Sequence, residues 1–110
     1  MTYKKGDTIP LQYVIEEWNV DTQGTEVHNL SGESVTFSMY CMDADFLIED
    51  RPCSVVVASD GLIEYEWATG ETDIDGMYRC LFKVTSSDGK VSTFPEYDTQ
   101  WLWIVDDSRV

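Results

Sequence analysis

The sequence predicts an all-β protein, namely an antiparallel β-sandwich of about seven to eight short strands. Several segments alternate apolar and polar residues with a period of two, and turn-forming residues separate them at intervals of about eight to twelve residues. No segment of helical length repeats its apolar residues with the period of an α-helix. A small barrel is the alternative arrangement of the same strands.

Length and composition indicate one folded domain over residues 1–110. A chain of 12.6 kDa supports a single hydrophobic core, whereas two domains would each be undersized. Hydrophobic residues make up 43% of the chain and aromatic residues 13%, including four Trp and six Tyr. This apolar surface is enough to offset the entropy of ordering, so we expect a compact fold.

The first strand is expected at residues 9–18 and is followed by a turn at 19–24 and a short extended segment at 25–30. Within 9–18 one face is apolar, which places that face toward the core. Its apolar residues are Leu11, Tyr13 and Ile15.

The segment 34–41 shows the clearest alternation in the chain and predicts a half-buried antiparallel strand. A further short strand is expected around residues 46–48, between acidic loops. The residues of 34–41 that should face the core are Val35, Phe37, Met39 and Cys41.

Two hairpins are expected in the second half of the chain. Residues 54–59 and 62–67 flank Asp60-Gly61, a pair typical of a two-residue turn with positive φ. This places Ile63, Tyr65 and Trp67 in the core. After a polar loop at 68–75, the strands 77–85 and 90–94 are joined by the turn residues 86–89.

The last strand is unusual because residues 101–105 are apolar on both faces, whereas the outer face of a sandwich is normally polar. Either the two Trp or the pair Leu102 and Ile104 must therefore face something other than the core. A covering loop is one explanation, and a contact surface for another subunit is the other, since Trp is enriched at interfaces. The candidate interface residues are Trp18, Trp101, Leu102, Trp103 and Ile104.

Charge excludes several classes of partner. The chain has 21 Asp and Glu against 7 Lys and Arg, which gives a formal net charge of -14. Nucleic acid and an anionic membrane would both be repelled, and the few basic residues are scattered. The acidity serves solubility alone, or it suits a partner with a basic docking surface.

The sequence shows no spanning apolar run and no signal-type apolar core after its N-terminus, so we expect a protein made in the cytoplasm. The three cysteines, Cys41, Cys53 and Cys80, have no metal-like spacing and are expected to be reduced core residues.

No residue pattern indicates catalysis, a cofactor or a metal. His28 lies near Ser31 and Ser34 but has no orienting carboxylate at a readable spacing, so it is expected to be a surface or turn histidine. The segment 71–76 resembles the first half of an EF-hand loop but has Phe82 where the bidentate Glu is required. The acidic residues Asp43, Asp45, Asp50, Asp106 and Asp107 are expected to be solvated. We therefore expect a protein that is not an enzyme.

The segment Gly76-Met77-Tyr78-Arg79-Cys80 resembles strand F of immunoglobulin domains, in which a tyrosine stands two residues before a cysteine. The resemblance implies an immunoglobulin-like sandwich. It does not extend to the disulfide, because Ile74 replaces the usual Asp and no Trp follows Cys41 closely.

A longer resemblance covers nearly the whole chain and concerns the immunoglobulin-like N-terminal domain of phage baseplate upper proteins. It is carried, in order, by five segments: Lys5-Gly6-Asp7-Thr8, then Gly24-Thr25-Glu26-Val27 with residues 30–37, the Asp60-Gly61 hairpin, Gly76-Met77-Tyr78, and Asp88-Gly89-Lys90-Val91-Ser92-Thr93-Phe94-Pro95.

This resemblance implies a non-catalytic bacteriophage virion structural protein that is assembled in the host cytoplasm. Because the family's domain leads a longer protein, a separate copy is expected to be an accessory subunit that docks on the tail or baseplate or decorates the capsid shell. Its expected partners are other virion structural proteins, in several copies or as a homo-oligomer. The alternative function is a soluble carbohydrate-binding or adhesion module that stacks ligands on exposed Trp and Tyr, Trp67 and Trp101 among them.

Overall fold

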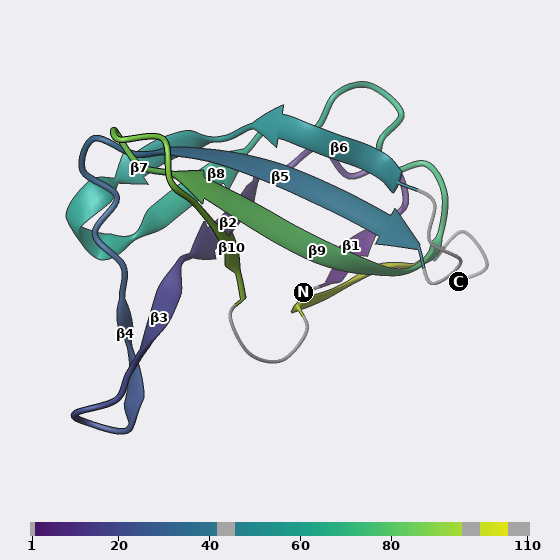
Figure 1. Cartoon of the computed structure of the whole chain (residues 1–110). Helices are drawn as coiled ribbons and strands as arrows, with labels where there is room; N and C mark the ends of the chain where they lie inside the picture. The colour runs from purple at the N-terminus through teal and green to yellow at the C-terminus, as the bar shows by residue number, and fades with distance from the viewer. Residues whose placement is uncertain (1, 42–45, 96–99, 106–110) are drawn as a thin grey trace.

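The computed structural model describes residues 2–41, 46–95 and 100–105, and the predicted all-β fold is confirmed (Figure 1). Within these ranges there is one 3-10 turn and no α-helix. Two sheets face each other across a hydrophobic core, and a separate two-stranded hairpin projects from them.

The larger sheet has β9 near its centre, because β9 is paired on one side with β5 and on the other with both β10 and β11. All of these neighbours are antiparallel to β9, whereas β1 runs parallel to β11 at the edge. The strands are β1 (Thr2–Lys4), β11 (Gln100–Val105), β9 (Gly76–Thr85), β10 (Val91–Phe94), β5 (Ser34–Cys41) and β6 (Phe46–Pro52).

The smaller sheet is antiparallel and has the strand order β2-β8-β7. Its strands are β2 (Leu11–Val14), β8 (Leu62–Tyr65) and β7 (Ser54–Val57). The inward residues of the two sheets form one core, in which Phe37, Phe82 and Ile63 are fully buried. Every core residue predicted from 34–41 lies on the inner side, and Trp67 packs against the same cluster.

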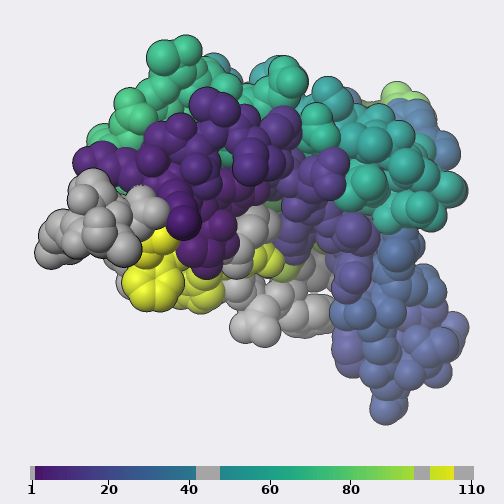
Figure 2. Space-filling view, turned by 180° about the vertical axis from the view of Figure 1, so that it is seen from behind, coloured from purple at the N-terminus to yellow at the C-terminus, as the bar shows by residue number. Residues whose placement is uncertain are grey.

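The projecting hairpin, which we call the arm, consists of β3 (Glu16–Asn19), the turn 20–23 and β4 (Gly24–Val27). It makes the molecule elongated, with principal extents of 48 × 27 × 25 Å. Figure 2 shows the arm standing away from the body at one end.

The structure contains more strand segments than the predicted seven to eight, because one expected strand is interrupted and Thr2–Lys4 form a strand that was not expected. The expected strand 9–18 is divided at Ile15, where the chain changes partners. The Ile15 N–H donates to the Gly61 carbonyl oxygen at 2.8 Å, in register with β2 and β8, and the Ile15 carbonyl oxygen accepts from the His28 N–H at 2.9 Å, in register with β3 and β4. The last two segments, β10 and β11, follow the same side of β9 with an interruption between Phe94 and Gln100. The short strand expected at 46–48 extends to Pro52.

The turn between β7 and β8 differs from the prediction. Ala58–Asp60 form a 3-10 turn, and only Gly61 has a positive φ, of 65°. The predicted two-residue turn with positive φ at both Asp60 and Gly61 is therefore wrong. Gly61 lies against the root of the arm, where an added Cβ would be 2.7 Å from the Ile15 carbonyl oxygen.

Tyr78 forms a tyrosine corner, the hydrogen-bonding feature found at the start of strand F in immunoglobulin domains. Tyr78 stands two residues before Cys80, and its hydroxyl donates a hydrogen bond of 2.7 Å to the Ile74 carbonyl oxygen. Cys41 and Cys80 lie on neighbouring strands of one sheet, and both are free thiols. Burial raises the pKa of Cys53 and of Cys80 to about 12, so both thiols stay protonated at neutral pH.

Candidate functional site

The apolar last strand, β11, has one face in the core and one face outside. Leu102 and Ile104 are 0% exposed, whereas Trp101 is 37% and Trp103 is 49% exposed. The sequence left open which pair would point outward, and the structure places the two tryptophans there. Leu102 and Ile104 are therefore core residues that anchor the strand and have no surface to offer a partner.

The outward side chains of three strands form rows across the larger sheet. In one row Arg79 of β9 lies directly between Tyr40 of β5 and Trp101 of β11. Its guanidinium carbon is 5.6 Å from the centre of the Tyr40 ring and 5.8 Å from that of Trp101, which is the geometry of cation–π contacts. The guanidinium therefore bridges the two aromatic rings.

The adjacent row holds Met77 beside Trp103, and Met77 is also exposed. We call the combined surface the tryptophan face; it consists of Tyr40, Met77, Arg79, Trp101 and Trp103. In Figure 2 the yellow residues of β11 lie at the molecular surface beside the purple N-terminal segment.

The predicted member Trp18 lies elsewhere. It is on β3 of the arm, paired with Thr25, and is 41% exposed. Figure 2 shows the arm apart from the yellow surface of β11. The candidate interface of five residues is thus divided into a core pair, a sheet face and an arm.

Trp67, a proposed stacking platform of the alternative function, is a packing residue. Its ring contacts Tyr3, Phe37 and Tyr65 edge to face, with centroid distances of 5.5, 6.0 and 5.4 Å. Within the described residues its buried indole Nε1 has no hydrogen-bond partner. Its ring supports the core, so Trp101 is the better platform for an external ligand.

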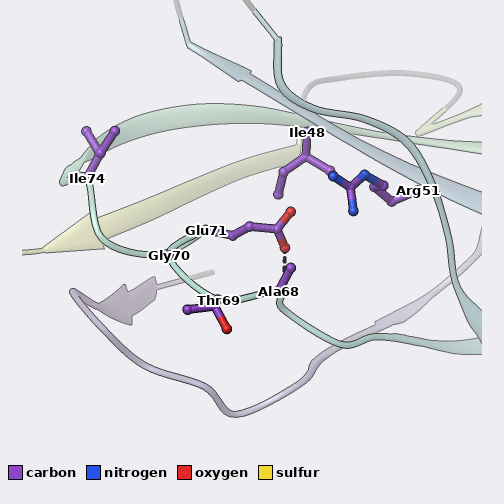
Figure 3. A pocket seen from close by; sticks show the side chains of 7 residues that line it. All are labelled: Ile48, Arg51, Ala68, Thr69, Gly70, Glu71 and Ile74. Carbon is purple, nitrogen blue, oxygen red and sulfur yellow. Dashed lines mark hydrogen bonds between the residues drawn. The ribbon is translucent and has the colours of Figure 1, made fainter.

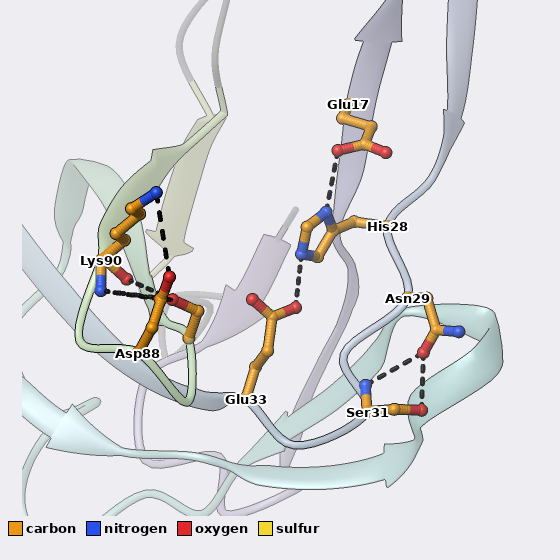
Figure 4. Close-up of polar contacts among 8 residues, drawn as sticks. Glu17, His28, Asn29, Ser31, Glu33, Asp88 and Lys90 are labelled. Carbon is orange, nitrogen blue, oxygen red and sulfur yellow. Dashed lines mark hydrogen bonds and ion pairs between the residues drawn. The ribbon is translucent and has the colours of Figure 1, made fainter.

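His28 lies where the arm joins the body, between two carboxylates (Figure 4). Its Nδ1 is 2.9 Å from Glu17 Oε2, and its Nε2 is 2.7 Å from Glu33 Oε1. Both ring nitrogens can bond to carboxylates only as donors, so this geometry favours the imidazolium form. Partial burial lowers the pKa of His28, but the hydrogen bonds to Glu17 and Glu33 outweigh it and raise the pKa above its ordinary value.

Sequence spacing did not reveal these carboxylates, because Glu17 comes from the opposite strand of the arm and Glu33 from the segment before β5. The nearby Ser31 hydroxyl donates to Asn29 Oδ1 at 2.7 Å (Figure 4). His28 is thus held by acids and Ser31 by an amide, an arrangement that joins chain segments rather than activating a nucleophile.

A hollow of about 310 Å³ lies between β6 and the loop that precedes β9 (Figure 3). Its lining includes Ile48, Arg51, Glu71 and Ile74. Glu71 accepts hydrogen bonds from the Tyr65 hydroxyl at 2.7 Å and from the Ala68 N–H at 2.6 Å. Burial, and then the hydrogen bond with Glu71, raise the pKa of Tyr65. Glu71 therefore holds its loop to the core.

The segment that resembles half an EF-hand is also structural. The Thr72 hydroxyl donates to the Asp7 carbonyl oxygen at 2.8 Å and ties this loop to the N-terminal segment. Among the residues that the structure describes, no three His, Cys, Asp or Glu side chains form a group able to hold a metal ion. Asp43, Asp45, Asp106 and Asp107 lie outside the described residues.

No known protein family matches the chain, and no curated protein is similar to it. In the described parts of the chain, no helix is long and apolar enough to cross a lipid bilayer.

Proposed function

We propose that this protein is a non-catalytic structural subunit of a bacteriophage particle, which docks in several copies on the tail or baseplate or on the capsid shell through its tryptophan face. The observation that carries the proposal is the outward position of Trp101 and Trp103 on a strand whose other face is fully buried. The phage assignment is supported by the sequence resemblance to the baseplate domain.

The chemistry of the tryptophan face suits a protein partner. Tryptophan, tyrosine and arginine are the residues most enriched at interface hot spots, where truncation of one anchor typically costs about 2 kcal/mol or more of binding. Trp101, Arg79 and Tyr40 stand in one row on adjacent strands. A sheet fixes such side chains before binding, so little conformational entropy is lost when a partner covers them.

Two further observations support a structural role. The net charge of -14 opposes binding to the packaged nucleic acid and to an anionic membrane. The groups that a hydrolase would need are held in structural contacts, since His28 lies between two carboxylates and Glu71 accepts two hydrogen bonds.

Particles purified from the phage that encodes the chain provide the test. We expect mass spectrometry to find the protein in the particle, and negative-stain imaging to find density that is missing from particles of a deletion strain. Added protein should restore that density, whereas the Trp101→Ala, Trp103→Ala double variant should not. Val91→Ala, which truncates an exposed apolar residue on β10, is the matched control and should bind as the wild type does. Absence of the protein from intact particles would contradict the proposal.

The second candidate function is carbohydrate binding, which the exposure of Trp101 favours because an accessible indole can stack against a sugar ring. Glycan arrays and calorimetry on the isolated protein separate it from the first. A saturable heat that disappears in Trp101→Ala would favour carbohydrate binding. A featureless titration across the array would exclude it, whatever the particle experiment shows.

A further inference from the structure

The arm is a second surface that the body of the protein leaves uncovered. The structure pairs β3 and β4 with each other as a two-stranded sheet of their own, and both views show the arm projecting from the sandwich (Figures 1 and 2). A two-stranded ribbon alone in water is marginally stable at best. A partner that covered the arm would therefore stabilise it.

One face of the arm exposes apolar side chains, together with Glu16 and Thr25. Trp18 is paired with Thr25 and Val27 with Glu16, so Trp18 and Val27 are diagonal neighbours on the same face. Val27 is 44% exposed, and Val20 in the turn is 74% exposed. Trp18 and Val27 thus form an exposed apolar patch on one face of the arm, and Val20 exposes a further apolar side chain at its tip.

The charges of the arm all have one sign. Glu16, Glu17, Asp21 and Glu26 lie on it, and residues 6–50 contain no Lys or Arg. Glu17 and Glu26 are directly opposite each other, a like-charge pair that destabilises a hairpin. This pair lies on the face of the arm opposite Trp18 and Val27, so the cations of a partner would relieve the repulsion from that side.

The root of the arm is hydrogen-bonded to the body of the protein. The Ile15 N–H donates to the Gly61 carbonyl oxygen at 2.8 Å, and the His28 N–H donates to the Ile15 carbonyl oxygen at 2.9 Å. The His28 ring also connects Glu17 of β3 to Glu33 on the body (Figure 4). An arm fixed in this way loses little orientational freedom when it binds.

We propose that the arm is a docking element for the surface of another protein, one that combines apolar residues with lysine and arginine. A second copy of this chain fits poorly, because its net charge is -14 and its Lys83 and Lys90 already pair with Asp50 and Asp88. The arm is separate from the tryptophan face. The chemistry that we propose for its partner does not depend on whether that partner belongs to a virion.

The test uses the full chain and a synthetic peptide of alternating lysine and valine residues, which offers one basic and one apolar face when extended. The side-chain N–H signals of the four tryptophans are followed by ¹H–¹⁵N NMR and assigned by single Trp→Phe variants. We expect the peptide to shift the Trp18 signal saturably and to leave the Trp101 and Trp103 signals in place.

Charge variants test the electrostatic part. Neutralising the arm with Glu16→Gln, Asp21→Asn and Glu26→Gln should weaken peptide binding about tenfold at low salt, because three exposed charge pairs are lost. The matched control, Glu66→Gln, Asp73→Asn and Asp75→Asn, makes the same change in net charge at exposed positions off the arm. It should change the affinity by less than about twofold, since those charges lie away from the bound peptide and are screened. The dispersion of the NMR spectrum confirms that each variant is folded.

Three results would overturn the inference. Equal weakening by both triple variants would show general attraction of a cation to an acidic protein. Shifts of Trp101 and Trp103 without Trp18 would place binding on the tryptophan face. If the Trp18 signal does not shift at millimolar peptide, the arm does not bind basic surfaces. Because the experiment needs no particle, its failure leaves the proposed virion role to be judged by the particle experiment alone.

Discussion

The tryptophan face and the arm both expose tryptophan, but they are built differently. Trp101 and Trp103 stand on β11, which is paired with β1 and β9 and anchored by Leu102 and Ile104 in the core. Trp18 stands on a hairpin made of nearby residues and held at its root by a few hydrogen bonds. We therefore expect the tryptophan face to be as stable as the whole fold, whereas the arm should be able to unfold locally.

The largest effect is expected from Leu102→Ala. It removes a fully buried side chain beneath the tryptophan face and should lower the free energy of unfolding by about 3 kcal/mol. Trp103→Ala, one residue away on the outer face, should cost less than about 1 kcal/mol because little core packing is lost. Urea unfolding of both variants measures the two losses in the free energy of unfolding. Equal losses would contradict the division of β11 into an anchoring and an exposed face.

Gly61→Ala tests the root of the arm. Its Cβ would lie 2.7 Å from the Ile15 carbonyl oxygen and 2.8 Å from that of His28, at a φ of +65°. We expect a loss of about 2 kcal/mol, combining backbone strain and displacement of these carbonyl groups. Hydrogen exchange should show the greatest loss of protection in β3 and β4.

Gly89→Ala is the control for that variant, because Gly89 also has a positive φ but has nothing within 4 Å of the added Cβ. It should cost only about 1 kcal/mol, from the backbone conformation alone. The same loss in both variants would show that contact with the arm has no part in the effect.

Tyr78→Phe removes the hydroxyl of the tyrosine corner at the start of β9, next to the rows of the tryptophan face. The Ile74 carbonyl oxygen loses a donor at 2.7 Å, so we expect a loss of about 1 kcal/mol. Protection of the arm should be unchanged, since the change lies at the other region. Thermal unfolding measures the loss of stability, and hydrogen exchange measures the protection of the arm. Lower protection in the arm would contradict the independence of the two regions.

The smallest effect is a pH dependence confined to the arm. The pKa of His28 is raised in the folded state, so its stabilisation is complete below the unfolded value of about 6.5 and is lost as pH rises through the folded pKa. Glu17, Glu33 and the Phe94 ring face it. We expect arm protection to fall over that range by less than about 1 kcal/mol, as for a partly exposed ion pair.

The titration of His28 is read directly by NMR. His28→Gln, which keeps hydrogen-bonding atoms but not the charge, should make arm protection independent of pH over the same range. A wild-type arm whose protection rises as His28 loses its proton would contradict the ion-pair assignment.

The strands were predictable where local pattern decides them. The bounds of 34–41 are confirmed to the residue, because its alternation continues unbroken from end to end. The first strand was predicted as continuous because Ile15 keeps the alternation of its face, although at Ile15 the chain passes from pairing with β8 to pairing with β4. The partners of His28 were not predictable, since Glu17 approaches it through the pairing of the two strands of the arm and Glu33 through the contact of the arm with the body.

From the sequence alone we predicted the all-β class, the two hairpins of the second half and a last strand with two apolar faces, because alternation and turn residues act locally. Only the tertiary structure decided that Trp101 and Trp103 lie outside and that Trp18 belongs to a separate arm. When both faces of a strand are apolar, its residues alone do not show which face will be buried. The register of β11 with β9 decides it. Tyr78 and Cys80 point inward, and Leu102, which is paired with Tyr78, points the same way.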